Sequence, residues 1–524
     1  MACATVSTLA TEIDGDDKGN LSMNPRMTRR SLAALLAAAP FPPLTAARAQ
    51  DSRTLTVGIV SDPVTLDPAL MASFFEISVQ FNIHEPLLHM TPDLQIEPGL
   101  ASVEVADPLT YRFTLKPSLT FHDGTPLDSA AVKANFDRML DPATASPRRS
   151  ELAPIGRMDI TGPLAFTITL SAPYAPLLQV LANRAGMMVS PAALKSLGAD
   201  FATKAVGAGP YRLVSWTKNS ELVVERFAGY WRGAPPIERI VFRPISDETV
   251  RLTNLRSGTV QLVDAVPAQA VGALGRDAGI TMKQAVGLGF NAFSFNITRP
   301  PFDDVRVRQA FTTAIDKQAV LRAVYFGTGS IAYGTIPPSM AWAFDPAFAS
   351  FKPSVDAARK LLAAAGHTAP VPVSITVTNS PAQVRTAEVL QAQANSAGFK
   401  VEVKQIDATS LIAVLRQKDF DLCMSPWSGR SDPDGNIYNY FTKAGPNNFM
   451  GYQSDAVTDL LVKARSAPDQ ASRAKLYREA EQQIASDAPM LFLTFPATLQ
   501  ASSKSLSWLQ YPDGAFRLQF ANFQ

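Results

Sequence analysis

The histidines and short motifs of this sequence leave little room for catalysis. Four histidines occur in 524 residues, and Pro86 separates the close pair His84 and His89, which prevents a helical two-histidine zinc site. A G-x-S-x-G elbow, a P-loop and a C-x-x-C pair are absent from the sequence. We therefore expect no enzymatic activity, no catalytic residue, no bound metal and no cofactor.

Three further motifs predict structure better than they predict chemistry. Residues 207–210, Gly-Ala-Gly-Pro, lack the third glycine of a dinucleotide fingerprint and predict a tight turn. Residues 432–436 resemble the start of a calcium loop but lack its sixth-position glycine and its closing glutamate. Cys423 lies in an apolar run without a paired histidine, which predicts an inert buried thiol.

The loop at 426–432 carries the residue types best suited to binding. Trp427 offers an apolar wall and Arg430 a planar fork of donors, a combination that suits a small organic ligand with an anionic group. The alternative is a packed tryptophan and a surface ion pair between Arg430 and Asp432. These residues alone leave both interpretations open.

A predicted β-α-β-α-β run positions this loop. Its strands are expected at 373–377, 401–403 and 420–424, and its helices at 381–397 and 409–418. That order predicts a largely parallel sheet covered by helices, in which ligands bind at the carboxyl ends of the strands. The loop after Met424 lies at such an end.

Alternation and helical periodicity predict the remaining elements. Alternation of apolar and polar residues indicates strands at 55–59, 111–115 and 166–170. Two more strands are expected at 222–225 and 240–242, separated by Pro235 and Pro236. Helix caps are predicted at Ser129, at Asp303 or Asp304 and at Ser354, and a further helix begins at Asp316. Two amphipathic helices are expected around 457–464 and 476–484, and a final strand at 517–520.

Length and composition exclude several classes of protein. The length predicts three to four domains of about 150 residues each. A hydrophobic content of 46% excludes disorder over most of the chain. The net charge of +2 gives no field strong enough to attract a nucleic acid.

Residues 1–49 have the features of an export signal. Arg29 and Arg30 precede a weakly apolar run at 32–39, and small residues stand at 47 and 49, where a signal peptidase cuts. The arginine pair is similar to a twin-arginine signal, while the general secretory route stays open. We expect cleavage after Ala49 and a periplasmic product. The start codon is left open among Met1, Met23 and Met27.

Eight short segments match one known family in order and spacing. They lie at 65–68, 85–88, 111–116, 121–126, 209–211, 230–231, 300–310 and 432–434. The most specific are Phe-His-Asp-Gly-Thr-Pro at 121–126 and Pro-Phe-Asp-Asp-Val-Arg-Val-Arg-Gln-Ala at 301–310. With these segments the chain resembles the family 5 solute-binding proteins of ABC transporters, which include dipeptide-, oligopeptide- and nickel-binding proteins.

The resemblance implies an α/β, two-lobed periplasmic-binding-protein (clamshell) fold with an extra domain inserted in the first lobe. After the signal, the implied parts are lobe 1 at 50–84, 201–290 and 491–524, the inserted domain at 85–200, and lobe 2 at 291–490. It also implies structural roles for most shared motifs. His122 and Asp123 would shape a turn, and Asp304, Arg306 and Arg308 would pair with neighbours near a helix start.

The ligand anchors of the resembling proteins are missing here. In the dipeptide and oligopeptide binders an aspartate three residues after the loop tryptophan pairs with the peptide ammonium, and Arg430 stands at that place. The dipeptide binder's arginine for the carboxylate falls near 377–380, where this chain has no arginine. The reversed charge favours a ligand that presents an anionic group to Arg430. The candidate ligand-binding residues are Trp427, Arg430, Asp432, Phe74 and Asn296.

The sequence therefore predicts an extracytoplasmic solute-binding protein of an ABC importer. It would capture a small peptide-like or anionic organic solute between two lobes and deliver it to the membrane permease. A monomer without a nucleic acid partner is expected. An extracytoplasmic hydrolase or a metal-handling protein is the alternative, and a receptor that reports to a sensor would use the same fold.

Overall fold

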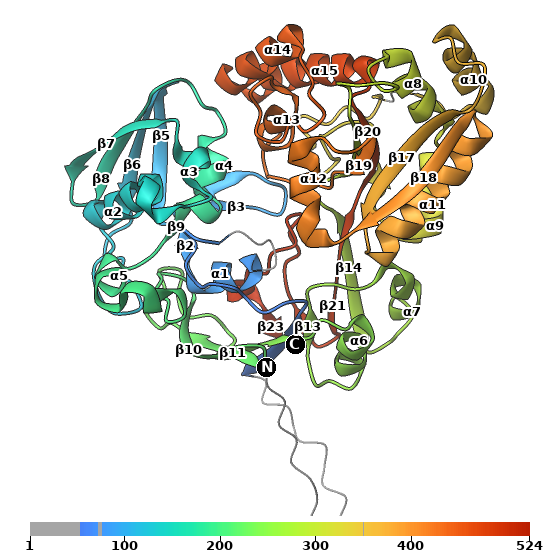
Figure 1. Cartoon of the computed structure of the whole chain (residues 1–524). Helices are drawn as coiled ribbons and strands as arrows, with labels where there is room; N and C mark the ends of the chain where they lie inside the picture. Colours follow the sequence, from blue (N-terminus) through green and yellow to red (C-terminus); the bar gives the residue numbers. More distant parts are fainter. Residues whose placement is uncertain (1–52, 72–75, 349–350) are drawn as a thin grey trace, which may run out of the picture. The chain divides into compact units, whose positions relative to one another are not determined.

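The computed structural model describes residues 53–71, 76–348 and 351–524 (Figure 1). The predicted export signal and the candidate Phe74 lie outside these residues. Within them the chain is a mixture of helices and strands with two large sheets and a smaller four-stranded one. The α/β class is confirmed.

The first large sheet has seven strands in the order β10-β11-β12-β1-β13-β21-β14. Its strands are β1 Thr54–Ile59, β10 Tyr211–Thr217, β11 Glu221–Arg226, β12 Arg239–Pro244, β13 Leu262–Val263, β14 Ile280–Val286 and β21 Ala497–Ser503. β1 pairs in parallel with β12 and β13, and the other pairs are antiparallel. The predicted strands at 55–59, 222–225 and 240–242 are confirmed. Around this sheet lie α1 Ile77–Ile83, α5 Pro191–Leu197, α6 Glu248–Arg256, α7 Val271–Leu274, β22 Leu506–Ser507, β23 Asn522–Phe523, η3 Gly198–Ala202 and η4 Ala268–Ala270.

The four-stranded sheet belongs to the segment between β1 and β10. It runs in the order β5-β6-β8-β7 and is antiparallel, with bounds β5 Ala101–Asp107, β6 Thr110–Leu115, β7 Ile155–Gly162 and β8 Ala165–Leu170. Tyr111, Phe113 and Leu115 are buried on one face of β6, as the alternation predicts. This segment also holds α2 Ser129–Leu140, α3 Arg149–Leu152, α4 Leu177–Leu181, β2 Glu85–Pro86, β3 Leu88–Met90, β4 Ile96–Pro98, β9 Met187–Met188, η1 Pro142–Thr144 and η2 Arg184–Gly186.

The helix cap predicted at Ser129 is wrong by one residue. Asp128 is the N-cap of α2, and its carboxylate accepts a hydrogen bond from the backbone amide of Ala131 at 2.9 Å. Both residue types cap helices well, so their adjacency in the sequence could not decide between them.

The second large sheet has six strands in the order β16-β20-β15-β19-β17-β18. Its strands are β15 Asn291–Phe295, β16 Ser330–Ile331, β17 Val371–Thr378, β18 Phe399–Ile406, β19 Leu422–Met424 and β20 Met490–Phe495. Only the predicted β-α-β-α-β unit, β17, β18 and β19, is parallel. The prediction of a largely parallel sheet is therefore half right, because β15, β16 and β20 add antiparallel pairs from outside that unit.

Three of the helices around this sheet, α8 Val305–Ala314, α9 Lys317–Tyr325 and α10 Val355–Ala364, begin after predicted capping residues. The others are α11 Pro381–Ser396, α12 Leu411–Gln417 after η5 Ala408–Ser410, α13 Asp434–Phe441, α14 Asp455–Ser466 and α15 Gln470–Asp487. Asp304, Asp316 and Ser354 each accept a hydrogen bond from a first-turn amide. Gly366 and Gly398, just after α10 and α11, have φ values of +89° and +106°, which side chains rarely adopt.

Two predictions for the C-terminal segment need correction. Residues 518–520 form the 3-10 helix η6 Leu518–Phe520, and the last strand is β23. β20 lies in the second large sheet, so the chain returns to the first sheet at Pro496, five residues after the predicted lobe boundary at 491. β20 is buried along its whole length, so it shows no alternation that could have marked it as a strand.

The chain crosses between the two large sheets twice, at 287–290 and at Pro496. The two crossings touch, because the amide of Gly287 donates to the carbonyl oxygen of Pro496 at 2.8 Å. A side chain at Gly289 would collide with the backbone of Trp427. The loop with the candidate binding residues therefore packs directly on one crossing.

Candidate functional site

The loop after β19 is held by backbone pairing and by one buried amide. Trp427 and Phe290 exchange two backbone hydrogen bonds of 2.9 and 3.0 Å. The indole of Trp427 donates to Oδ1 of Asn436, in α13, at 2.9 Å and meets the ring of Tyr440 edge-on at 5.5 Å. The same oxygen of Asn436 accepts the backbone amide of Arg430 at 2.8 Å. One side chain of α13 thus fixes both candidate residues.

Arg430 lies over Trp427. Its guanidinium carbon is 4.5 Å from the centre of the indole ring, and its Nη1 donates to the carbonyl of Gly429 at 2.8 Å. Its Nε is 3.8 Å from Oε1 of Glu151, in α3. Burial lowers the pKa of Arg430, and Glu151 partly offsets that shift. The side chain is 26% exposed and keeps free donors.

A cavity of about 390 Å³ lies between this loop and the four-stranded segment. One wall comes from residues in and near α3, α4 and η2, and the other from residues 427–447 together with one arginine of α14. The charged side chains on its walls are Arg148, Glu151, Arg184, Arg430, Asp432, Asp434 and Arg465.

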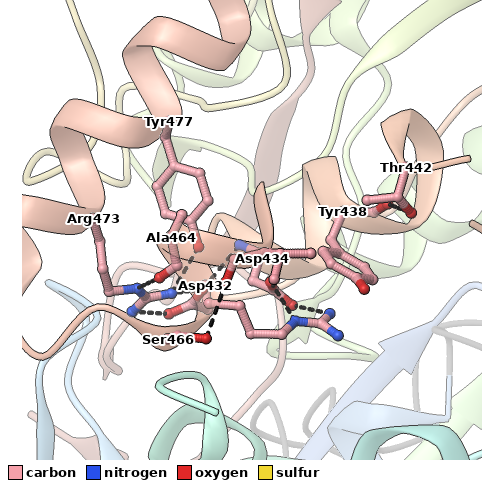
Figure 2. Close-up of polar contacts among 10 residues, drawn as sticks. Asp432, Asp434, Tyr438, Thr442, Ala464, Ser466, Arg473 and Tyr477 are labelled. Atoms are coloured by element: carbon pink, nitrogen blue, oxygen red, sulfur yellow. Dashed lines mark hydrogen bonds and ion pairs between the residues drawn. The ribbon is translucent and has the colours of Figure 1, made fainter. Parts of the chain in front are cut away.

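Two of the three carboxylates on the walls, Asp432 and Asp434, are bound by arginines of α14 and α15 (Figure 2). Asp432 accepts two hydrogen bonds from Arg473, of 3.0 and 2.6 Å, and both side chains are about 95% buried. Asp434 accepts two from Arg465, of 2.9 and 2.7 Å. Arg473 also donates to the hydroxyl of Tyr477 at 2.9 Å. The surface ion pair between Arg430 and Asp432 considered above does not form, because Asp432 is bound to Arg473.

Three further arginines, Arg148, Arg184 and Arg430, line the cavity with one remaining carboxylate, Glu151. Nη1 of Arg148 lies 2.5 Å from Oε1 of Glu151, the oxygen that also faces Arg430. Arg184 is 6% exposed and makes no side-chain hydrogen bond or ion pair with any residue that the structure describes. Burial and the neighbouring charges of Arg430 and Arg148 lower the pKa of Arg184 to about 9, so it stays charged at pH 7. The cavity therefore carries excess positive charge.

The sequence-predicted candidates separate into two groups. Trp427, Arg430 and Asp432 lie on the cavity wall. Asn296 lies elsewhere, where its amide donates to the carbonyl of Lys418 at 2.8 Å. Phe74 lies outside the described residues.

Sequence reasoning missed Arg148 and Arg184. Both lie in or beside short helices without periodicity, and nothing in the sequence distinguishes Arg148 from its neighbour Arg149. Arg149 donates to the carbonyl of Leu140 and does not line the cavity. Only the tertiary structure separates the two.

Several motifs that suggested the family have structural roles. The carboxylate of Glu85 accepts hydrogen bonds from His89, Tyr230 and Trp231, at 2.5, 3.1 and 2.7 Å. His122 contacts the carbonyl of Gly209 at 3.0 Å. These contacts join the segment at 85–88 to that at 230–231, and the segment at 121–126 to that at 209–211.

The motif at 301–310 and Cys423 behave as the sequence analysis predicted. Asp304 binds Arg306, and Arg308 donates to backbone carbonyls, including that of Phe302. Cys423 is buried, and burial raises the pKa of its thiol to about 12. Among the described residues no three His, Cys, Asp or Glu side chains are grouped so that they could hold a metal ion.

A sequence model of the bacterial extracellular solute-binding proteins, family 5, matches residues 95–449. The chain belongs to this family. The glutathione-binding protein GsiB of Escherichia coli O1:K1 is 30% identical over 498 residues, which cover 90% of this chain and 95% of that protein. GsiB of Salmonella paratyphi A is 29% identical over 523 residues, covering 95% of this chain and 99% of that protein.

Solved structures have the same fold. AgaA of A. tumefaciens R10, a periplasmic binding protein in complex with agropinic acid, is 28% identical with a TM-score of 0.76, covering 90% of this chain and 99% of AgaA. HbpA2 of Haemophilus parasuis is 24% identical with a TM-score of 0.81, covering 90% of this chain and all of HbpA2. The two-lobed binding-protein fold is thereby confirmed.

Family membership gives the general function. The protein captures a small solute and delivers it to the permease of an ABC importer. In the described part of the chain, no helix has the length and apolar character needed to cross a membrane.

Proposed function

We propose that this member of the family binds a small peptide-like solute through an anionic group, in the cavity beside Trp427 and Arg430. The observation that carries the proposal is the guanidinium of Arg430, which lies over the indole with donors to spare in a positively charged cavity. A carboxylate that accepts two of those donors would form a charge-assisted pair.

The size and chemistry of the walls support a compact organic solute. About 390 Å³ is within the usual range for small-molecule sites, which combine apolar walls with a few placed polar groups. Trp427 and Tyr174 provide aromatic surface on opposite walls, while Gln179 and Asn439 provide amides. Peptides and their derivatives present the matching amide and carboxylate groups.

The relatives support the same ligand class. Two of them are named for binding glutathione, a small peptide, and the structure of AgaA contains agropinic acid. We also propose that the chain is exported to the periplasm, that its signal is cleaved after Ala49, and that it acts as a monomer.

Calorimetric titration of Arg430→Ala with glutathione tests this function. Removing a charge-assisted hydrogen bond costs about 1.5 to 3 kcal/mol, so affinity should fall roughly tenfold to a hundredfold. Unfolding without ligand should change little, because the guanidinium is a quarter exposed and its nearest carboxylate, Glu151, retains Arg148.

Arg149→Ala is the matched control, because it removes the same charge from a position off the cavity wall. A variant Arg430→Ala that loses stability without ligand but keeps full affinity would show that Arg430 is a structural residue. The proposed contact with the solute would then be wrong.

A further inference from the structure

Arg184 is a buried cation without a partner. It begins η2, lines the cavity, and is 94% buried, yet its guanidinium meets no acceptor among the described residues. Two of its electrostatic neighbours, Arg430 and Arg148, have the same sign. Buried charges in folded proteins are almost always paired or bound to a ligand. The carboxylates of Glu76, Glu151 and Asp513 act on Arg184 electrostatically, but none of them forms a hydrogen bond or ion pair with it. Its guanidinium therefore lacks a bonded acceptor.

Arg148 adds a second incomplete group on the same wall. Its Nη1 is bound to Glu151, but its Nε is buried and has no hydrogen-bond partner. Glu151 also faces Arg430 and is 23% exposed. After the pairs of Asp432 and Asp434 are set aside, one carboxylate faces three guanidinium groups. On the cavity wall, Arg148, Arg184 and Arg430 therefore outnumber the remaining carboxylate, Glu151.

The three arginines come from two parts of the chain. Arg148 immediately precedes α3, and Arg184 begins η2; both belong to the segment with the four-stranded sheet. Arg430 follows β19 of the second large sheet. A single carboxylate at Arg430 would leave Arg184 buried and unpaired, at a continuing cost. A ligand with two separate carboxylates could pair with Arg430 on one wall and with Arg184 on the other.

We propose that Arg184, assisted by Arg148, is a second anion anchor, and that the solute carries two carboxylates, which bind Arg430 and Arg184. This inference rests on the proposed function, since it concerns the same cavity. It makes Arg184 a specificity-determining residue, because a solute with one carboxylate leaves this guanidinium without a partner.

The test is a calorimetric cycle with two ligands and three proteins. The ligands are glutathione, which has two carboxylates, and its glycine monoethyl ester, which has one. The proteins are the wild type, Arg184→Gln and the control Arg149→Gln, which lowers the net charge equally from outside the cavity. Inorganic phosphate is titrated into the wild type as a compact anion that cannot span two anchors.

We expect the wild type and Arg149→Gln to bind glutathione ten- to a hundredfold more tightly than the ester. In Arg184→Gln that preference should disappear, and Arg184→Lys should restore part of it. Phosphate should bind much more weakly than glutathione. The melting temperature of Arg184→Gln without ligand should equal or exceed that of the wild type, because an unpaired buried charge has been removed.

The inference is overturned if Arg184→Gln keeps the preference, if phosphate binds as tightly as glutathione, or if Arg184→Gln melts well below the wild type. Binding of the ester but not of glutathione also overturns it and leaves the proposed function intact. Binding of neither peptide contradicts both proposals.

Discussion

At the scale of single residues, burial decides which charges are available. Asp432 and Arg473 satisfy one another and are no longer free to bind a solute, while Arg430 and Arg184 keep donors. The types and positions of Trp427 and Arg430 could be read from the sequence. The pairing of Asp432 could not, because its partner Arg473 lies 41 residues away, on α15.

Lys317 is a buried cation that lies away from the cavity. Its ammonium is buried, donates to the carbonyl of Ala332 at 3.0 Å and lies 4.6 Å from the ring centre of Tyr333. Burial lowers its pKa to about 7. Because the folded state favours the neutral amine, the charged form of Lys317 lowers the free energy of unfolding by its full amount below pH 7. This destabilisation disappears as the pH rises from 7 toward 10.5, the ordinary pKa of lysine.

We therefore expect Lys317→Met to be more stable than the wild type at pH 6, by roughly 2 to 4 kcal/mol after the lost bond to Ala332 is discounted. The difference in unfolding free energy between Lys317→Met and the wild type should be smaller at pH 9. Urea unfolding at pH 6 and pH 9 measures it. The control Lys133→Met alters an exposed lysine and should show no such narrowing. Parallel curves for Lys317→Met and the wild type would show that Lys317 is not destabilising when charged.

At the scale of elements, α13 and the loop before it form one positioning unit. Asn436 holds both Trp427 and Arg430, and Gly435 leaves room for the arginine. A Cβ added at Gly435 would lie 2.6 Å from Cβ and from Cγ of Arg430. Helix α13 was not predicted, because it starts within Pro-Asp-Gly-Asn at 433–436, residue types that favour turns.

Gly435→Ala should therefore displace the backbone and side chain of Arg430 while its charge remains. We expect glutathione affinity to fall about tenfold, with no change in the net charge of the protein. Calorimetric titration measures this effect. Gly272→Ala is the control, because an added Cβ there has no contact closer than 3.9 Å. Unchanged affinity in Gly435→Ala would mean that the exact place of Arg430 does not matter for binding.

Strands and helices with a regular pattern were predicted well, and the exceptions have physical causes. β6 and α10 bury one face, so their periodicity is visible in the sequence. β20 is buried on both faces and shows none. The segment at 518–520 has residues typical of a strand but forms a 3-10 helix. Its neighbours Phe516 and Ala521 are buried in the core of the first large sheet.

At the scale of the whole molecule, one cavity combines parts that are far apart in the sequence. Its walls come from residues 147–184 and from 427–465, and the loop at Trp427 packs on the crossing at Gly289. The family resemblance implied this arrangement, whereas periodicity alone could not, because it does not relate distant segments. The charge of the cavity emerges only from the assembled walls.

The most direct test of the central claim is native mass spectrometry of the protein purified without denaturation from its own bacterium. We predict a bound small organic molecule in the wild type, released on denaturation and detected as an anion with peptide-like fragments. Arg430→Ala purified in parallel should carry much less of it. A wild-type protein that retains a cationic solute or a metal ion, with equal occupancy in Arg430→Ala, would contradict the account.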